Sequence, residues 1–247
     1  MYFFFYVLHL NEIDTLLLFF LFQQPVFFTQ KKIWTINQYI SYPMNQSVIF
    51  VCFDIETSGP CFRDNFIVSI GACSVDINEQ RKENIRINLY EPSKSHIFDH
   101  DTFNNFWIPN MKTLTELKRD RETPQQGIGR LLNWVDSLYQ RYERVVFVGD
   151  NSEFDYSWIN YYIRSFSTGR DQLTYRNGVY VGNLVSIPDV LHGICKSIVA
   201  KSRKMDQLKF LLGDNMIMVP NTHFPDEDAE CIVLNFIRII KKYEISY

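Results

Sequence analysis

A continuous apolar run, Val48–Ile55, constrains the fold of this 247-residue chain more than any other feature. The run is rich in β-branched and aromatic residues, a pattern typical of a strand that is buried on both faces. A second such run, Phe66–Val75, follows it, and Asn84–Tyr90 alternates between polar and apolar residues, as a strand with one solvent-facing side does. The turns between these runs are short, so we predict an antiparallel meander of three strands.

The rest of the chain alternates between helix-like and strand-like segments. Gln125–Tyr142 and Asp226–Lys242 carry apolar residues at helical spacing, which predicts two amphipathic helices. A meander followed by alternating strands and helices predicts an α/β fold, with a mixed five-stranded sheet flanked by helices. The other predicted segments are strands at Arg144–Gly149 and Leu184–Ile187, and helices at Ser152–Phe166, Asp189–Ala200 and Met205–Leu212.

Residues 1–28 differ from the rest of the chain because Phe and Leu dominate them. Two apolar runs, Met1–Leu8 and Leu16–Phe22, flank a polar break that contains Glu12 and Asp14. A membrane-spanning helix needs about 20 mostly apolar residues, and neither run is that long. A secretory signal needs a basic start and a cleavage site of small residues, and the segment has neither. Membrane association through this segment is therefore the weaker expectation.

Three interpretations of the segment stay open: a poor membrane anchor, a hydrophobic helix packed on the domain, or a translated upstream extension. We favour the extension, because Met44 lies just ahead of the first predicted strand and would serve as a start. The expected organisation is a hydrophobic extension over residues 1–45 and an enzyme-like domain over residues 46–247. The hydrophobic content of 46% is enough for one substantial core.

Charge and cysteine content narrow the functional class and the compartment. The formal net charge is −3, which is ordinary for an enzyme and unlike a protein that coats nucleic acid. If nucleic acid is the substrate, the positive charge must be local. The five cysteines contain no C-x-x-C spacing, which argues against a disulfide framework or a zinc site. We expect the cytoplasm or another reducing intracellular compartment.

Two carboxylates, Asp54 and Glu56, stand at the end of the first predicted strand. The two-residue period of a strand turns both side chains to the same face. Such a pair repels unless a cation lies between its members, and hard divalent cations such as Mg²⁺ prefer oxygen ligands. The D-x-E pattern is common in surface turns, but the apolar residues before this pair indicate a strand exit. The pair therefore predicts a metal site.

Further acidic residues open two of the predicted helices. Asp155 lies in the first turn of the helix predicted at Ser152–Phe166, and Asp228 lies in the first turn of the last helix. The helix dipole favours acids at helix starts, so each of these residues is a weak signal alone. His223 lies on the loop five residues before Asp228, where a lone histidine is more often structural than catalytic.

Taken in order, these residues resemble the three motifs of the DEDD exonuclease superfamily, in its histidine subgroup. The first family motif is D-x-E-T/S-x-G, the second resembles H-N-x-x-F-D, and the third is H-x-x-x-x-D-A. The resemblance covers roughly Val48 to Ile240 and implies an RNase H-like fold. The matching residues are Asp54, Glu56, Thr57, Ser58 and Gly59 in the first motif, Asn151, Phe154 and Asp155 in the second, and His223, Asp228 and Ala229 in the third.

The resemblance implies hydrolysis of phosphodiester bonds at 3′ ends, with two divalent cations, Mg²⁺ or Mn²⁺, as cofactors. The implied substrate is single-stranded RNA or DNA with a free 3′ end. His223 would accept the proton of the attacking water as general base. The implied metal ligands are Asp54, Glu56, Asp155 and Asp228, and the implied substrate contacts are Thr57, Ser58, Asn151 and Phe154.

Two departures from the family pattern bear on the site. Asp150 stands where the second motif usually has histidine, which adds a negative charge near the metal site. Phe224 occupies the position, four residues before Asp228, at which the tyrosine subgroup has its tyrosine. Because Phe224 has no hydroxyl group, His223 is the better candidate for the base.

The motifs do not separate RNA from DNA, because one metal centre hydrolyses both and the residues that would contact a 2′-hydroxyl are not identifiable. We lean slightly towards RNA. The alternatives are a DNA exonuclease of the proofreading or repair type and a non-catalytic module that binds nucleic acid with the same fold. Such a module is expected to have lost a ligand, and none is lost here. Phe106 and Trp107 would either stack on bases or pack in the core, and we favour packing.

Overall fold

The computed structural model describes residues 48–150, 152–168, 173, 175–176, 179–180, 183–186, 204–218 and 222–244. These residues belong to one compact unit. The extension predicted over residues 1–45, the helix predicted at Asp189–Ala200 and the substrate contact predicted at Asn151 lie outside the described residues and stay predictions. Within the described ranges, no helix has both the length and the apolar character that crossing a membrane requires.

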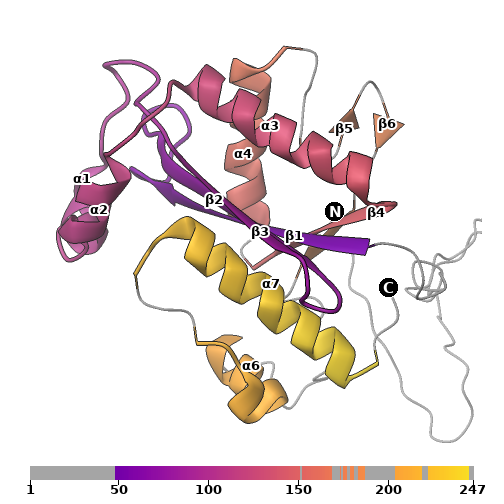
Figure 1. Cartoon of the computed structure of the whole chain (residues 1–247). Coiled ribbons are helices and arrows are strands. Elements are labelled where there is room, and N and C mark those ends of the chain that lie inside the picture. The colour runs from indigo at the N-terminus through magenta and orange to yellow at the C-terminus, as the bar shows by residue number, and fades with distance from the viewer. Residues whose placement is uncertain are drawn as a thin grey trace, which may run out of the picture. The chain divides into compact units, whose positions relative to one another are not determined.

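A mixed sheet of five strands runs through the domain (Figure 1). Its first part is the antiparallel meander of β1 (Val48–Thr57), β2 (Ile67–Asp76) and β3 (Lys82–Asn88). β4 (Arg144–Gly149) pairs in parallel with β1, and β7 (Asn183–Ser186) pairs in parallel with β4. The spatial order is β3-β2-β1-β4-β7, which confirms the predicted mixed sheet and its meander.

Helices cover both faces of this sheet (Figure 1). α3 (Pro124–Arg141) and α4 (Ser152–Phe166) pack on one face, and α6 (Lys204–Leu212) and α7 (Pro225–Lys242) pack on the other. Thr123 forms a capping box with the residue three positions later, and proline follows it, so the start of α3 is well defined. These four helices begin and end within one or two residues of the predicted segments.

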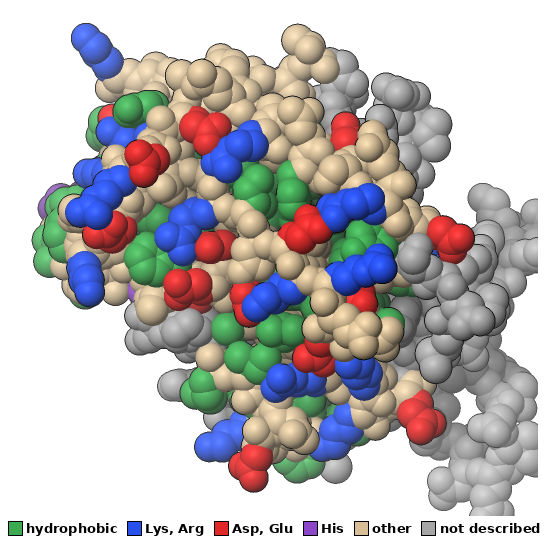
Figure 2. Space-filling model, in the orientation of Figure 1, with side chains coloured by type: hydrophobic (Ala, Val, Ile, Leu, Met, Phe, Trp, Pro, Cys, Tyr) green, Lys and Arg blue, Asp and Glu red, His purple; other side chains and the backbone are tan. Residues whose placement is uncertain are grey.

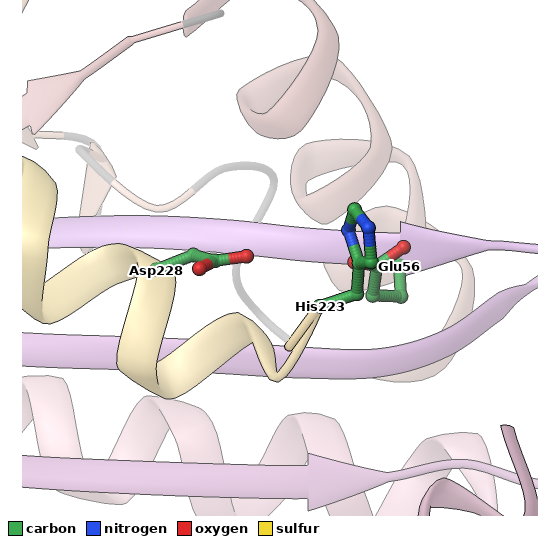
Figure 3. Close-up of side chains that lie close together, drawn as sticks. All are labelled: Glu56, His223 and Asp228. Atoms are coloured by element: carbon green, nitrogen blue, oxygen red, sulfur yellow. The ribbon is translucent and has the colours of Figure 1, made fainter. Parts of the chain in front are cut away.

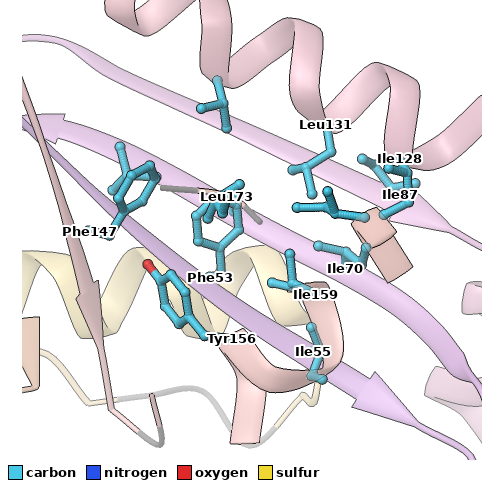
Figure 4. Packing of buried hydrophobic residues seen from close by; sticks show 14 of the residues in the cluster. Phe53, Ile55, Ile70, Ile87, Ile128, Leu131, Phe147, Tyr156, Ile159 and Leu173 are labelled. Atoms are coloured by element: carbon cyan, nitrogen blue, oxygen red, sulfur yellow. The ribbon is translucent and has the colours of Figure 1, made fainter. Parts of the chain in front are cut away.

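The two-residue period of β1 divides the hydrophobic core into two layers. Phe53 and Ile55 belong to the layer between the sheet and the α3–α4 pair, as Figure 4 shows. Phe50 and Cys52 belong to the layer beneath α7 and α6. Burial of a large apolar side chain stabilises the fold by about 1.5–3 kcal/mol. β1 therefore holds both layers together, as its uninterrupted apolar sequence predicts.

The segment between β3 and α3 contains helices that the periodicity did not predict. α1 (His100–Thr102), the π-helical turn η2 (Phe103–Trp107) and α2 (Met111–Leu117) follow one another there. Trp107 is fully buried, which confirms core packing, and its indole N–H donates to the carbonyl of Thr57 over 3.0 Å. This segment is therefore fixed to the end of β1. The remaining described elements are β5 (Tyr175–Arg176), β6 (Val179–Tyr180) and the 3₁₀ turn η3 (Gly213–Asn215).

Candidate active site

The end of β1 carries Asp54 and Glu56 on the side of the sheet that α7 covers, because they continue the alternation of Phe50 and Cys52. The register between β1 and β2 shifts between Glu56 and Thr57, and such bulges redirect side chains at strand ends. Glu56 is only 8% exposed, whereas Asp54 is partly buried. A carboxylate as deeply buried as Glu56 requires a bound proton or a compensating positive charge.

The start of α7 brings a second carboxylate and a histidine to the same place. Asp228 lies in the first turn of α7, and His223 lies on the loop before it. One ligand atom from each of Glu56, His223 and Asp228 lies within 4.8 Å of the others, and Figure 3 shows the three side chains at the end of β1. Nδ1 of His223 is 3.9 Å from Oε1 of Glu56. Residues from nearly opposite ends of the domain sequence therefore converge here.

Asp155 reaches this region from the first turn of α4. It is 5% exposed, and its side chain accepts a hydrogen bond from the backbone N–H of Ile55, between Asp54 and Glu56. Burial raises the pKa of Asp155, and the hydrogen bond from Ile55 acts in the opposite direction. The charge of Asp155 also helps to raise the pKa of Glu56, so the two carboxylates interact.

The electrostatics of the group fit a divalent cation. Burial is the main cause that raises the pKa of Glu56 to about 9, and the charges of Asp228 and Asp155 raise it further. Burial also raises the pKa of Asp228 to about 6, with Glu227 and Asp226 adding to the effect. Oδ1 of Asp228 is buried and has no hydrogen-bond partner among the described residues. An unpaired carboxylate oxygen beside other buried acids is a donor set that suits Mg²⁺ or Mn²⁺.

The loop that carries His223 is fixed from two sides. The backbone of His223 has a φ of 54°, in the left-handed region that residues other than glycine seldom adopt. Its ring meets the ring of Phe106 edge to face, with the centroids 4.8 Å apart. The carbonyl of Thr222 accepts a 2.7 Å hydrogen bond from the hydroxyl of Thr113 in α2. A strained backbone that its surroundings hold in place is typical of functional loops.

A glycine in β2 allows α7 to come this close to the sheet. Gly71 pairs with Asp54 in the β1–β2 ladder. A Cβ atom at Gly71 would lie 2.0 Å from the backbone nitrogen of Asp226 and 2.0 Å from the carbonyl carbon of Pro225. Any side chain at this position would therefore displace the start of α7, and Asp228 with it.

The two hydroxyl residues after Glu56 have different surroundings. Ser58 is fully buried, and its hydroxyl donates to the carbonyl of Ile97 over 3.0 Å and accepts from the N–H of Phe66 over 2.9 Å. The hydroxyl of Ser58 is therefore engaged in fixing the loop after β1. Thr57 is partly exposed beside Glu56, so its side chain has more freedom to meet a substrate.

Phe154 is partly buried in α4, where its ring packs on the core and meets Trp158 edge to face at 6.3 Å. Neither Gly71 nor Phe106 belongs to the three motifs, although Gly71 contacts the start of α7 and Phe106 contacts His223. A glycine inside an otherwise β-branched strand signals a close approach of another backbone, and that signal is present at Gly71. The contact between Phe106 and His223 has no comparable signal in the sequence.

Comparison by sequence finds one relative of known activity. The chain is similar to the 3'-5' DNA exonuclease Cap18 of Escherichia coli, with 32% identity over 123 residues. The matched region is 48% of this chain and 58% of that relative, so the chain spans less than two thirds of the relative's length. No protein-family model matches the chain.

Comparison by structure finds nucleases with the same fold. E. coli ExoI in complex with single-stranded DNA, in its zinc-bound form, has a TM-score of 0.54 and 16% identity over 81% of this chain and 41% of that chain. The nuclease domain of 3'hExo, a DEDDh family member bound to rAMP, has a TM-score of 0.57 and 12% identity over 81% of this chain and 94% of that chain. The chain has the RNase H-like fold of these nucleases, as its motifs predicted, and part of it is similar in sequence to a 3′–5′ DNA exonuclease.

Proposed function

We propose that this protein is a metal-dependent exonuclease that removes nucleotides from 3′ ends. The observation that carries the proposal is the convergence of Glu56, His223 and Asp228, whose ligand atoms lie within 4.8 Å of one another at the end of β1. Asp155 interacts electrostatically with Glu56. Asp54 lies two residues before Glu56, on the same face of β1. The similarity to a 3'-5' DNA exonuclease supports the same activity.

Asp54, Glu56, Asp155 and Asp228 would hold two divalent cations, Mg²⁺ or Mn²⁺. Their carboxylate oxygens are the ligands that these ions prefer. Burial first, and then the negative charges of Asp228 and Asp155, raise the pKa of Glu56, and a bound cation would offset both effects. When bound, such a pair of ions supplies a water-derived nucleophile and stabilises the leaving oxygen. The contribution of the chain is to hold four acids together against their mutual repulsion.

His223 would accept the proton of the attacking water as general base. Its side chain is 27% exposed, so water and substrate can reach the ring from the solvent side. Nδ1 of His223 lies 3.9 Å from Oε1 of Glu56, so the ring is beside one of the proposed metal ligands. The neighbouring Phe224 cannot replace it, because a phenylalanine ring carries no titratable group.

The substrate that we favour is single-stranded DNA with a free 3′ end, whose terminal nucleotide Thr57 would contact. The sequence relative is named as a DNA exonuclease, and one ExoI structure contains single-stranded DNA. The slight lean towards RNA at the sequence level has no support from that relative. The 3'hExo structure contains rAMP, so RNA is the second arm of the experiment.

End-labelled oligonucleotides test the activity and its direction. The purified protein is incubated with single-stranded DNA and RNA that carry a label at the 5′ or the 3′ end, in Mg²⁺, in Mn²⁺ and in chelator. A 5′ label should pass through a ladder of successively shorter products. A 3′ label should appear at once in a mononucleotide. Chelator should stop both reactions.

Asp54→Asn and Asp214→Asn form a matched pair of variants for this assay. Asp54→Asn removes a proposed metal ligand and should abolish hydrolysis, whereas Asp214 is an exposed acid in η3 and its variant should keep the wild-type rate. Hydrolysis that begins at the 5′ end or persists in chelator would refute the proposal, and so would a wild-type rate in Asp54→Asn.

A further inference from the structure

The edge strand β3 presents three polar side chains to α7. Lys82, Asn84 and Arg86 are alternate residues, so they share one face of the strand. Lys82 and Asn84 both bind Glu230, with donor-to-oxygen distances of 2.5 Å and 2.6 Å. Arg86 instead binds Asp226, in the first turn of α7. Figure 2 shows this side of the molecule, where cationic and acidic side chains are intermingled and do not form separate patches.

Arg86 makes contacts that Lys82 and Asn84 do not make with the described residues. Its Nε donates to Oδ1 of Asp226, and its Nη2 lies 3.8 Å from Oε1 of Glu227. Its guanidinium carbon also lies 4.2 Å from the centroid of the Phe224 ring, which is cation–π geometry. A planar guanidinium can pair with carboxylates through its edge while it stacks through its face. Arg86 therefore holds residues on both sides of Pro225.

The residues that Arg86 holds are next to the candidate site in the chain. Phe224 directly follows His223, and Asp226 lies two residues before Asp228. Phe224 is also the N-cap of α7, and it makes no side-chain capping hydrogen bond. The hydroxyl of Thr222 donates to Oε2 of Glu227 over 2.8 Å, and contacts from other elements add to this local contact.

The sheet places Arg86 in the same cross-strand row as the first carboxylate of the site. Gly71 pairs with Asp54 on one side and with Arg86 on the other. The backbone of Pro225 and Asp226 lies directly against Gly71. The start of α7 is therefore seated on β2, between Asp54 on β1 and the guanidinium on β3.

We propose that Arg86 is a positioning residue for the hydrolysis proposed above, and the kinetic part of this inference rests on that proposed function. Its guanidinium stacks on Phe224 and binds Asp226, and so it fixes the segment that carries His223 and Asp228 against the end of β1. Arg86 would not touch the reacting atoms itself. Its effect would pass to them through the backbone of this segment.

Lys82 supplies the matched comparison. Its ion pair with Glu230 joins the same strand to the same helix, but it reaches the helix beyond Asp228, and among the described residues it makes no hydrogen bond or ion pair with Thr222 or His223. Partly exposed ion pairs of this kind contribute little to stability. If Arg86 were only another ion pair between β3 and α7, substitution of either residue would have the same consequence.

Steady-state kinetics on end-labelled single-stranded DNA separate the two cases. Arg86→Met keeps an unbranched apolar stem and removes the charge and the plane of the guanidinium. We expect kcat to fall about 10- to 100-fold, the range for residues that orient groups at a metal site. KM should stay within about threefold of wild type, because ground-state binding is not what is lost. Lys82→Met should keep kcat within about twofold.

Two further variants separate positioning from a general loss of folding. Arg86→Lys keeps the pair with Asp226 and loses the stacked plane, so it should restore only part of kcat. Phe224→Leu removes the ring and should lower kcat in the same direction as Arg86→Met. Thermal unfolding of each variant gives its folded fraction, and kcat is calculated per folded molecule.

A readout without catalysis keeps the two proposals distinguishable. The ring resonances of His223, assigned with a His223→Gln variant, should shift in Arg86→Met, because the ring leaves Phe106, and should be unchanged in Lys82→Met. Unchanged resonances in both variants, or equal kcat values for them, would overturn the role of Arg86. If wild type shows no chelator-sensitive hydrolysis, the proposed function fails, and the resonances still decide whether Arg86 fixes the loop.

Discussion

The two halves of the candidate site are built in different ways. Asp54 and Glu56 lie where β1 is paired with β2, so the period of the strand sets their direction. His223 and Asp228 owe their position to contacts with residues that are remote in sequence, among them Gly71 of β2. The position of the β1 half is therefore set mainly by local strand geometry. The α7 half depends on tertiary packing, and substitutions outside the site can displace it.

The largest effect should come from the β1 half. Glu56→Gln keeps the shape of the side chain and removes its charge, so we expect kcat to fall by on the order of 10³-fold through loss of metal-assisted charge stabilisation. In chelator, Glu56→Gln should be no less stable than wild type, because a buried carboxylate without a counter-ion is unfavourable. Glu83→Gln, which alters a partly exposed acid paired with Arg141, is the control and should keep activity. Near-wild-type turnover in Glu56→Gln would remove this residue from the site.

Gly71→Ala should damage the α7 half by displacing the start of the helix. Its Cβ would meet the backbone of Pro225 and Asp226 at 2.0 Å, so we expect a loss of about 1–3 kcal/mol in the free energy of unfolding, together with most of the activity. Gly129 in α3 is the control, because no described atom outside its own helix backbone lies within 4 Å of a Cβ there. Gly129→Ala should stabilise the fold by up to about 1 kcal/mol. Urea unfolding that ranks the two variants in the opposite order would contradict the seating of α7 on β2.

The stability of the metal-free protein should fall as pH rises from about 5 to about 9. The folded state holds the proton of Glu56 up to a pKa of about 9, whereas the unfolded chain releases it near the ordinary value of 4.5. In that window the folded state binds more protons, so stability is lost with rising pH, by at most about 1.4 kcal/mol per pH unit for each proton. The raised pKa values of Asp155 and Asp228 act in the same direction.

Thermal unfolding in chelator between pH 5 and pH 9 measures this dependence. Glu56→Gln should flatten the slope, and Mg²⁺ should restore stability at the alkaline end, because an ion that binds only the folded state stabilises it. A melting temperature that rises across the same pH range would contradict the assignment of buried acids to one cluster.

The smallest effect should come from the ring that supports His223. Phe106→Leu keeps an apolar side chain and loses the edge-to-face contact with His223. Such a contact contributes about 0.5–1.5 kcal/mol, and losing that amount of transition-state stabilisation would lower kcat about 2- to 10-fold. Phe103→Leu is the matched control, because Phe103 lies in the same π-helical turn and contacts Phe98 instead. Equal rates for the two variants would show that Phe106 does not support the base.

The sequence predicts the β1 half well, because strand alternation is a local property. The apolar run before Asp54 indicates a buried strand, and the period then places Glu56 on the same face. The sequence predicts the α7 half only through the family motif, because no local sequence pattern indicates which residues fix His223 in place. That information lies in residues of other elements, such as Thr113, whose contacts exist only in the folded chain.

The strand β3 illustrates the same limit. Alternation over Asn84–Tyr90 predicts a face turned to solvent, but α7 covers part of that face with its acids. Asp226 and Glu230, which look like acids favoured by the helix dipole, are ion-pair partners of β3. A polar strand face has the same sequence pattern whether water or a charged helix lies against it, so periodicity cannot distinguish the two.

Direct measurement of metal binding tests the central claim that the two halves form one metal site. Mn²⁺ is titrated calorimetrically into wild type, Glu56→Gln, Asp228→Asn and the exposed control Asp214→Asn. We expect two ions to bind wild type and the control alike, and we expect substitution in either half to weaken binding by at least about tenfold. Unchanged Mn²⁺ affinity in both Glu56→Gln and Asp228→Asn would contradict the claim.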